Sequence, residues 1–434
     1  MSSPSLVART ALFLYRHAEG GASVRDWAVL LIGCVSFGGA IVAALVLPRH
    51  ASLIALLAAV AGLLASVTSF GSIAARYATP EAIAGSIAVF ISGITAGYAV
   101  VSTLLPYLDR AGREPVLDPA EGDLDGVVLV GCCDPERYDP RAVARRQNIL
   151  EHDAGIVVPV TALPFVYFAE KARYHAIGGR APGHAAARLV ADRLLNAPGA
   201  APWRVALAWC HTPATPASAV ASLAREGVRR IALVPLGLPE SGPLDEARKP
   251  LDDLLRVAGA PAVGTAASVW RDRLLPGRLA ERIIAATAHA ALSEVGVVLV
   301  GEGAPPAWEK RYATAAEAET YFDQRVRALL GDAGIPERHI RMCWLEWQTP
   351  DVTEAVRHVA ALGCTRIVVA PATIALPTLQ TSLDLSHAVA LARVPEEVLV
   401  VTLQPWGDDE GFVDAVRRSA AEALNALREQ EADA

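Results

Sequence analysis

One hexapeptide occurs twice in the chain and limits the available folds more than any other feature. Gly-Val-Val-Leu-Val-Gly stands at residues 126–131 and again at residues 296–301. A short Val-rich run without a polar residue is typical of a strand buried on both faces, as in a parallel sheet. Each copy leads into a polar turn closed by proline, at residues 132–135 and 302–305. Because ligands of open α/β sheets bind beside the carboxyl ends of such strands, these two loops are the first candidates for a site.

Strands alternate with helices on both sides of residue 290. A second repeated pattern supports duplication, because residues 227–235 and 363–371 share a Gly, a short turn, an apolar run and a final Pro. We expect strands at 126–131, 156–160, 204–210, 230–235 and within 262–270, and then at 297–301, 340–347, 366–370 and 398–403. Alternation of this kind implies parallel sheets with right-handed crossovers. The predicted fold class is therefore α/β, with two similar Rossmann-type parallel-sheet domains in tandem, 126–290 and 291–434, and a cleft between them.

The N-terminal part is predicted to be a three-helix transmembrane region. Residues 27–48, 51–75 and 82–108 contain no charged side chain. Each segment exceeds the roughly 20 residues that a helix needs to cross a bilayer. A buried hairpin of a soluble protein would not need three such segments, and a cleaved signal peptide would be shorter. We expect an integral membrane protein, of the bacterial inner membrane, in which residues 109–125 form a linker to the α/β part.

Sidedness is less well determined by the sequence. Arginines near the spans are divided four to three between the two sides, with Arg9, Arg16, Arg25 and Arg76 against Arg49, Arg110 and Arg113. This count places the N-terminus in the cytoplasm and the α/β part on the far side. The six cysteines include no Cys-x-x-Cys pair, so neither a zinc site nor an iron–sulfur cluster is expected. Buried free thiols would favour a reducing compartment, against the arginine count, and sidedness stays open.

The ends of the chain and its charge add two further expectations. Residues 1–26 form a tail in which positions 4–17 alternate apolar side chains with arginine, as in an amphipathic surface helix. The net charge of −7, without any Lys/Arg-rich run, excludes the electrostatic footprint of a nucleic-acid-binding protein.

Several stretches resemble ferrochelatases, the class II tetrapyrrole chelatases. Residues 173–182 resemble their Tyr-x-x-Ile-Gly-Gly-x-Ser-Pro stretch, and residues 234–241 resemble Leu-Pro-Leu-Tyr-Pro-x-x-Ser. Residues 128–135 and 299–305 resemble Leu-Leu-x-Asn-Leu-Gly-Thr-Pro and Ser-Ala-His-Gly-Leu-Pro, while residues 379–384 resemble Leu-Glu-Thr-Leu-x-Glu. The resemblance spans about residues 126–430 in the right order, and the membrane region has no counterpart in the usual family member.

The resemblance implies a membrane-anchored protein that binds a porphyrin in the interdomain cleft and inserts Fe²⁺ to make heme, a lyase reaction. Two family positions differ here. The catalytic His aligns with Glu302, and the first Glu of the other motif aligns with Gln380, which can neither take a proton nor carry charge. Asp384 keeps the second acidic position. The implied catalytic residues are thus Glu302, Asp384 and Gln380, with Glu302 and Asp384 as metal ligands.

The same resemblance and the strand-end loops supply candidate substrate-binding residues, namely Cys132, His211, Tyr174, Gly178, Gly179, Pro235 and Ser241. Each also has a structural interpretation as a turn, helix-end or packing residue. Fe²⁺ would be the substrate metal and a porphyrin or heme the ligand, with no resident cofactor assigned. The alternative is a catalytically degenerate tetrapyrrole- or heme-binding carrier, sensor or assembly subunit. The expected partners are the tetrapyrrole and the lipid bilayer, and a homo-oligomer or a membrane-protein partner is left open.

Overall fold

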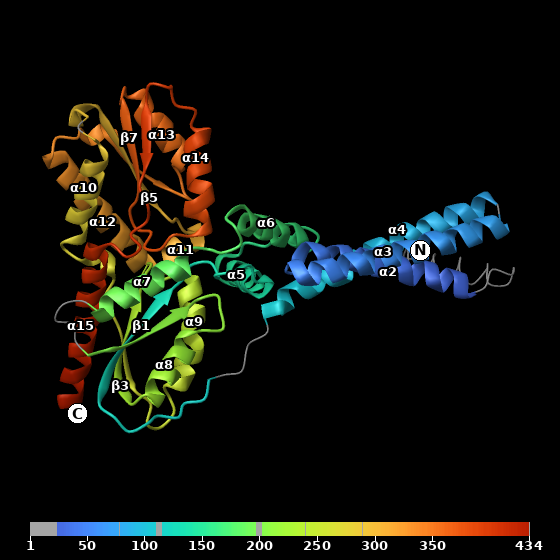
Figure 1. Ribbon diagram of the computed structural model, residues 1–434, viewed down its shortest axis with the longest axis horizontal. Coiled ribbons are helices and arrows are strands. Elements are labelled where there is room, and N and C mark those ends of the chain that lie inside the picture. Colours follow the sequence, from blue (N-terminus) through green and yellow to red (C-terminus); the bar gives the residue numbers. More distant parts are fainter. Residues whose placement is uncertain are drawn as a thin grey trace. The chain divides into compact units, whose positions relative to one another are not determined.

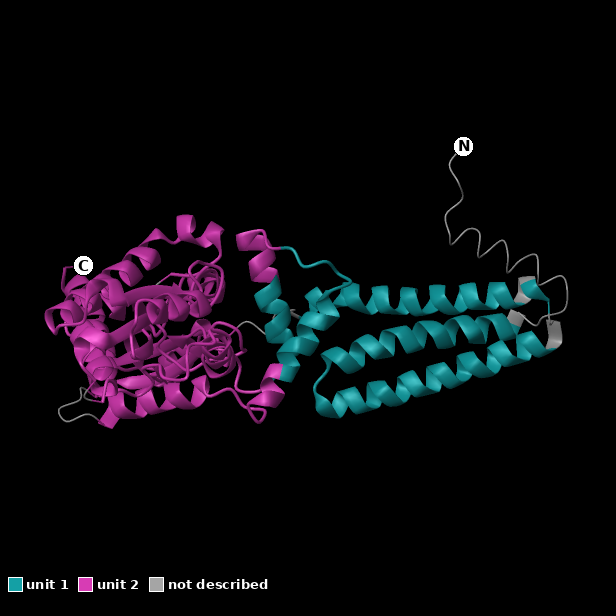
Figure 2. Ribbon diagram, turned by 90° about the horizontal axis from the view of Figure 1, so that it is seen from above, with its two compact units in different colours: residues 1–110, 138–147, 157–172 teal, residues 111–137, 148–156, 173–434 magenta. Residues whose placement is uncertain are grey.

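The computed structural model describes residues 24–77, 79–109, 115–196, 202–238, 240–288 and 290–433. The amphipathic helix expected at 4–17 lies outside these residues. The chain forms two compact units (Figure 2). Unit 1 contains residues 1–110, 138–147 and 157–172, and unit 2 contains residues 111–137, 148–156 and 173–434.

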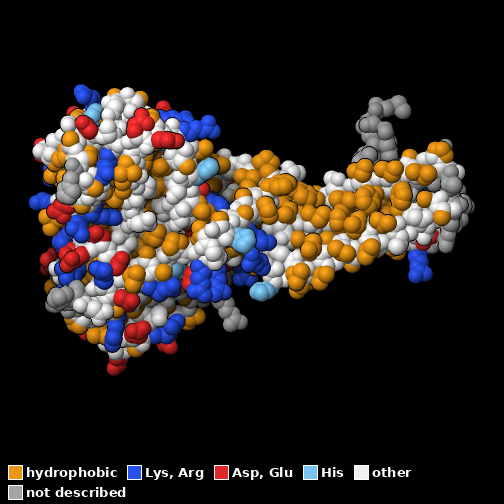
Figure 3. Space-filling view, turned by 45° about the horizontal axis from the view of Figure 1, so that its top comes forward, with side chains coloured by type: hydrophobic (Ala, Val, Ile, Leu, Met, Phe, Trp, Pro, Cys, Tyr) orange, Lys and Arg blue, Asp and Glu red, His pale blue; other side chains and the backbone are white. Residues whose placement is uncertain are grey.

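Unit 1 is built on three long apolar helices, α2 (Val24–Val46), α3 (Arg49–Tyr77) and α4 (Pro80–Leu104), followed by the short 3₁₀ helix η1 (Leu105–Asp109). Their apolar stretches of 22, 27 and 26 residues are long enough to cross a membrane, judged by length and composition. Hydrophobic side chains cover the surface of this helical part (Figure 3). Glycine lets two backbones approach, because a Cβ at Gly97 of α4 would lie 2.0 Å from the carbonyl oxygen of Val35 in α2.

Unit 1 also contains parts of two helices from the α/β region, α5 (Pro140–Ala154) and α6 (Leu163–Ala176). Val42 and Val46 of α2 pack in one apolar cluster with Val143 of α5 and Tyr167 of α6. The strand predicted at 156–160 is wrong, because this segment is irregular. Pro159 has no N–H to donate to a ladder, and Val158 packs against the cluster of unit 1 instead of joining a sheet.

Unit 2 holds two four-stranded parallel sheets with the same strand order. The first has the order β2-β1-β3-β4, from β1 (Leu124–Gly131), β2 (Arg204–Trp209), β3 (Val228–Pro235) and β4 (Ala262–Thr265). The second has the order β6-β5-β7-β8, from β5 (Val295–Gly301), β6 (Ile340–Trp344), β7 (Arg366–Pro371) and β8 (Leu399–Thr402). The two hexapeptides occupy equivalent inner strands, β1 and β5, which explains why their side chains are buried on both faces. The predicted α/β class and the duplicated parallel sheets are confirmed.

Helices cover both sheets (Figure 1). They are α7 (Gly183–Asn196), α8 (Pro216–Arg225), α9 (Gly242–Leu254), α10 (Leu275–Ala286), α11 (Pro306–Arg311), α12 (Ala313–Asp332), α13 (Val352–Ala361), the π-helical η5 (Gln380–Asp384), α14 (Leu385–Leu391) and α15 (Glu410–Ala432). One large core joins the two halves, and each sheet has a smaller core on its other face. The C-terminal helix α15 belongs by sequence to the second half but packs on the first sheet, where Leu427 contacts Gly264.

Candidate functional site

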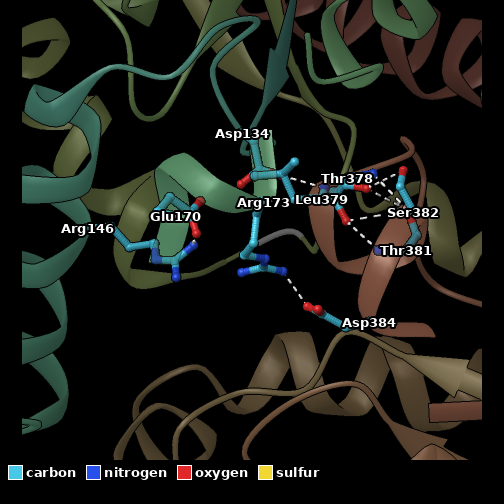
Figure 4. A network of polar contacts seen from close by, with 9 residues as sticks. All are labelled: Asp134, Arg146, Glu170, Arg173, Thr378, Leu379, Thr381, Ser382 and Asp384. Carbon is cyan, nitrogen blue, oxygen red and sulfur yellow. Dashed lines mark hydrogen bonds and ion pairs between the residues drawn. The ribbon is translucent and has the colours of Figure 1, made fainter. Parts of the chain in front are cut away.

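The loop after β1 reaches the second half through Asp134. This side chain is buried, and its Oδ2 accepts a hydrogen bond of 2.7 Å from the backbone N–H of Leu379, at the start of the helical segment that continues as η5 (Figure 4). An N–H in the first turn of a helix has no partner within the helix, so Asp134 acts as a capping residue from a distant part of the chain. The sequence placed Asp134 in a candidate loop but did not reveal its capping role, because its partner lies 245 positions away.

The end of α6 joins the same network. Tyr174 is buried, and its hydroxyl donates to the carbonyl oxygen of Pro135 at 2.6 Å. The neighbouring Arg173 forms an ion pair with Asp384 (Figure 4). Asp384, a predicted metal ligand, therefore has a cation of the first half as its partner. Arg173 was not among the predicted site residues, although it opens the motif that suggested the family.

Gly178 and Gly179 end α6, as the sequence predicts. Both have positive φ, 82° and 89°, and the N–H of Gly179 donates to the carbonyl oxygen of Tyr174 at 2.7 Å. A Cβ at either glycine would meet open space. Their backbone conformation therefore accounts for glycine here, and contact with a flat ring stays a prediction.

Gln380 and Asp384 lie one turn apart in a π-helix. The N–H of Leu385 donates to the carbonyl oxygen of Gln380, a five-residue step that a regular α-helix does not have. Thr378 and Thr381 cap the start of this segment reciprocally: Thr378 Oγ1 accepts from the N–H of Thr381 at 3.2 Å, and Thr381 Oγ1 accepts from the N–H of Thr378 at 2.8 Å. Short π segments are frequent at functional sites, where they reorient side chains. Regular α-helical structure follows only from Leu385 onward, in α14.

Glu302 stands in the loop after β5 and is exposed. The loop pairs with residues beyond β6, through hydrogen bonds from Leu345 N–H to the carbonyl oxygen of Gly301 (3.1 Å) and from Glu346 N–H to that of Glu302 (3.2 Å). Gly303 has φ 85°, and a Cβ there would lie 2.0 Å from the carbonyl oxygen of Glu346. Glu302 is therefore presented on a tightly held backbone at the carboxyl edge of the second sheet.

Two buried acids lie one turn apart on α12, and sequence reasoning missed both. Glu319 contacts the position of Gly301, where a Cβ would come within 2.4 Å of its Oε1, and it accepts a hydrogen bond of 2.6 Å from Thr373 Oγ1. Burial raises the pKa of Glu319, and burial together with Glu319 raises that of Asp323 well above its usual range. Both acids lie on the buried, otherwise apolar face of α12. Their burial and contacts are seen only in the folded structure.

Cys132 and Cys210 form a disulfide, with Cα atoms 4.9 Å apart. The prediction of free thiols at these two positions is wrong, and Cys132 is not a thiolate ligand while the bond is intact. The reason is register: Gly131 of β1 pairs with Trp209 of β2, so the next residue of each strand emerges side by side. Cys133 is a buried free thiol, and burial beside Asp134 raises its pKa. The remaining free cysteines that the structure describes are Cys34, Cys343 and Cys364, all buried.

The other predicted binding residues have structural contacts. Ser241 begins α9, where its Oγ accepts from Leu244 N–H at 3.3 Å. Pro235 is buried at the end of β3, and His211 is half-buried directly after Cys210. Among the described residues, no group of three or more His, Cys, Asp or Glu side chains is arranged to hold a metal ion. A two-carboxylate site of Glu302 and Asp384 remains a prediction.

A buried histidine near the first loop was also missed. His184, at the start of α7, stacks on Trp209 with ring centroids 3.7 Å apart. Trp209 in turn covers Gly131, the last residue of the first hexapeptide. Burial lowers the pKa of His184 to about 4, so its imidazole is neutral near pH 7.

Comparison with known proteins identifies one part of the chain. Residues 296–423 match the CbiX family model. The CbiX-like segment runs from β5 into α15 and includes Glu302, Gln380 and Asp384. The predicted chelatase resemblance is thereby confirmed in its coarse form, whereas the ferrochelatase assignment is not. No curated protein matches the chain.

Similar solved structures include two of SirB and one of CbiX. SirB from Bacillus subtilis with Fe³⁺ is 14% identical, with 71% of this chain and 98% of that chain covered and a TM-score of 0.43. The sirohydrochlorin chelatase SirB from Bacillus subtilis subspecies spizizenii, in complex with cobalt, gives the same values. CbiX, the terminal enzyme for biosynthesis of siroheme in denitrifying bacteria, is 17% identical over 69% of this chain and 99% of that chain, with a TM-score of 0.38.

Proposed function

We propose that the chain binds a tetrapyrrole at the carboxyl edges of its two sheets and inserts a divalent metal ion into it. The observation that carries this proposal is the CbiX match over residues 296–423, because the matched segment contains the Glu302 loop and the π-helix. The network of Asp134, Tyr174 and Arg173 supports it, since it joins loops of the first half to that segment. Ligands commonly bind at such edges of open α/β sheets.

Insertion exchanges two protons for one metal ion. The free tetrapyrrole carries two pyrrole N–H groups, and both protons must leave as the four nitrogens bind the divalent ion. The exposed carboxylate of Glu302 is our candidate for the group that receives a proton and passes it to water. The metal is a substrate in this reaction, and the proposal names Fe²⁺ and a porphyrin, which would give heme.

The alternative is a tetrapyrrole- or heme-binding carrier, sensor or assembly subunit that has lost insertion. One observation favours it: Asp384, which keeps the family's second acidic position, is ion-paired with Arg173. A carboxylate held by a guanidinium is a poorer ligand and a weaker base than a free one. The replacement of the other acid by Gln380 points the same way.

The test uses the full chain in lipid nanodiscs. Protoporphyrin, sirohydrochlorin and heme are each titrated while the Soret band is recorded, and Fe²⁺ or Co²⁺ is then added without oxygen. We expect a saturable spectral change with a tetrapyrrole, followed by conversion to the metal complex. Binding without conversion would identify the carrier or sensor, and no change with any tetrapyrrole would overturn both functions.

Two variants separate a role of Glu302 from an effect on folding. Glu302→Gln should slow insertion at least tenfold and leave binding intact, since general acid–base groups contribute about 10²–10⁴-fold. Glu397→Gln is the matched control, because Glu397 is also exposed but precedes β8 at the opposite, amino edge of the sheet. Equal rates for both variants would remove Glu302 from the mechanism.

A further inference from the structure

The first half of helix α6, residues 163–169, is apolar on its outer face as well as on its inner face. Within unit 1, Leu163 and Tyr167 are buried. On the opposite face, Phe165 is 60% exposed and Phe168 is 49% exposed. Helices that are apolar all round are found inside large proteins or in membranes. A water-exposed surface does not explain this composition.

The segment before α6 has the same character. Val157 is 66% exposed and Val160 is 41% exposed. Residues 154–169 contain no charged side chain, although they are too few to cross a bilayer. Apolar stretches of this length are typical of buried, re-entrant or interfacial segments. Because the outward side chains of this stretch are exposed in unit 1, burial inside the unit is excluded for them.

Hydrogen bonds fix the stretch to the ends of the three apolar helices. Tyr98 of α4 donates to the carbonyl oxygen of Thr161 at 2.7 Å, and Tyr167 of α6 donates to that of Leu105 at 3.2 Å. Lys171 Nζ donates to the carbonyl oxygen of Ala44 at 3.1 Å, in the last turn of α2, where carbonyl groups lack helical partners. The stretch therefore lies at the level where the apolar helices end.

The chemistry around the stretch is that of a membrane interface. Tyrosine rings are enriched where lipid meets water, and Tyr98, Tyr138 and Tyr167 all bond to backbone carbonyls at this end of unit 1. The two charged side chains that directly follow the stretch are both turned inward, with Glu170 ion-paired to Arg146 and Lys171 bonded to α2 and α3. The outer surface is thus left to Val157, Val160, Phe165 and Phe168.

We propose that residues 157–172 form an interfacial segment that inserts these four side chains into the headgroup region of the bilayer. The partner is lipid, because the segment is continuous with the ends of helices that have the length and composition of membrane spans. The α/β part is then attached to the membrane by a folded element as well as by the three helices. This inference does not depend on the proposed tetrapyrrole chemistry.

Site-directed spin labelling of the full chain in phosphatidylcholine nanodiscs tests the proposal. Phe165→Cys and Phe168→Cys would carry the label, because the described free cysteines are buried and the wild-type chain measures their background. Collision with oxygen, which concentrates in lipid, is compared with collision with a water-soluble nickel chelate. We expect oxygen to dominate at both positions.

Two further positions calibrate the measurement. Leu57→Cys, exposed on the apolar helix α3, should give an oxygen-dominated signal, and Tyr321→Cys, exposed on α12, should give a nickel-dominated one. A nickel-dominated signal at Phe165 and Phe168 would overturn the proposal. Protection from both reagents would also overturn it, because protein would then cover the segment. If a variant misfolds, a lipid-restricted carbene label on the wild-type chain should still modify residues 157–172 and leave α12 unmodified.

Discussion

Single residues at the ends of the two hexapeptide strands decide what the neighbouring loops can do. Gly303 is the clearest case, because both its φ of 85° and the 2.0 Å approach of the Glu346 carbonyl oxygen exclude a side chain. The loop that presents Glu302 therefore depends on a glycine two residues after the strand. The second hexapeptide is thus followed directly by the site candidate Glu302 and by Gly303, which sets the backbone conformation of the loop.

Gly303→Ala should destabilise the chain by about 2 kcal/mol or more, since strain at such a position alone costs roughly 1–3 kcal/mol. Thermal unfolding of the full chain in detergent, followed by tryptophan fluorescence, measures the change. Gly331→Ala is the control: it lies within α12 with open space around it, so it should stabilise by roughly 0.5–1 kcal/mol. A Gly303→Ala chain as stable as wild type would contradict the described loop.

His184 makes stability depend on pH. Its folded pKa of about 4 lies below the unfolded value near 6.5, so the unfolded chain binds the extra proton first as pH falls. Stability should therefore be full above about pH 6.5 and decline toward pH 4, by at most about 3 kcal/mol. His184→Phe keeps the stacking on Trp209 and should flatten this part of the profile. An unchanged slope between pH 7 and pH 4 would show that other groups cause it.

Residue types near strand ends were predictable, but their partners were not. Glu302, Gln380 and Asp384 could be named because motifs in their own neighbourhood marked them. The roles of Asp134, in a candidate loop, and of Arg173 could not be predicted, since their bonds join positions 245 and 211 residues apart. The sequence around a charged residue does not show whether its side chain is solvated or held in a hydrogen-bond network. Only the folded structure distinguishes these two cases.

At the scale of elements, periodicity identified the eight strands of the two sheets but failed where tertiary packing decides. The apolar run at 156–160 has strand composition, yet it packs within unit 1 and forms no ladder. The π-helix at Gln380–Asp384 has no sequence period that separates it from an α-helix. The packing of α15, which belongs by sequence to the second half, on the first sheet likewise follows from contacts between distant segments.

The disulfide between the ends of β1 and β2 should stabilise these elements. It closes a loop with a sequence separation of 78, and bonds of this kind typically contribute about 2–4 kcal/mol. The double variant Cys132→Ser with Cys210→Ser should lower the unfolding free energy by that amount. Cys343→Ser, a buried free thiol on β6, controls for the loss of a sulfur atom. Equal stability of reduced and oxidised wild-type chains would contradict this expectation.

At the scale of the whole molecule, the disulfide bears on sidedness. Disulfides persist in oxidising compartments, which agrees with the arginine count that places the α/β part outside the cytoplasm. The opposing expectation rested on free thiols, and two of those six cysteines are bonded. A reporter enzyme that is active only after export, fused after residue 434, should be active in intact cells. A fused fluorescent protein that matures only in the cytoplasm should stay dark, and the reverse pattern would refute this orientation.

Unit 1 is discontinuous along the chain, and this has a consequence for biosynthesis. The three apolar helices are synthesised before residue 110, yet Leu105 accepts its hydrogen bond from Tyr167, 62 residues later. Leu105 can therefore gain this partner only after the first strand of unit 2 has been synthesised. Conversely, a fragment that begins after residue 114 would expose Val143, Leu163 and Tyr167, which pack on α2 and η1. A soluble version of the α/β part would need polar residues at these positions, because removing the three apolar helices alone exposes the side chains that pack on them.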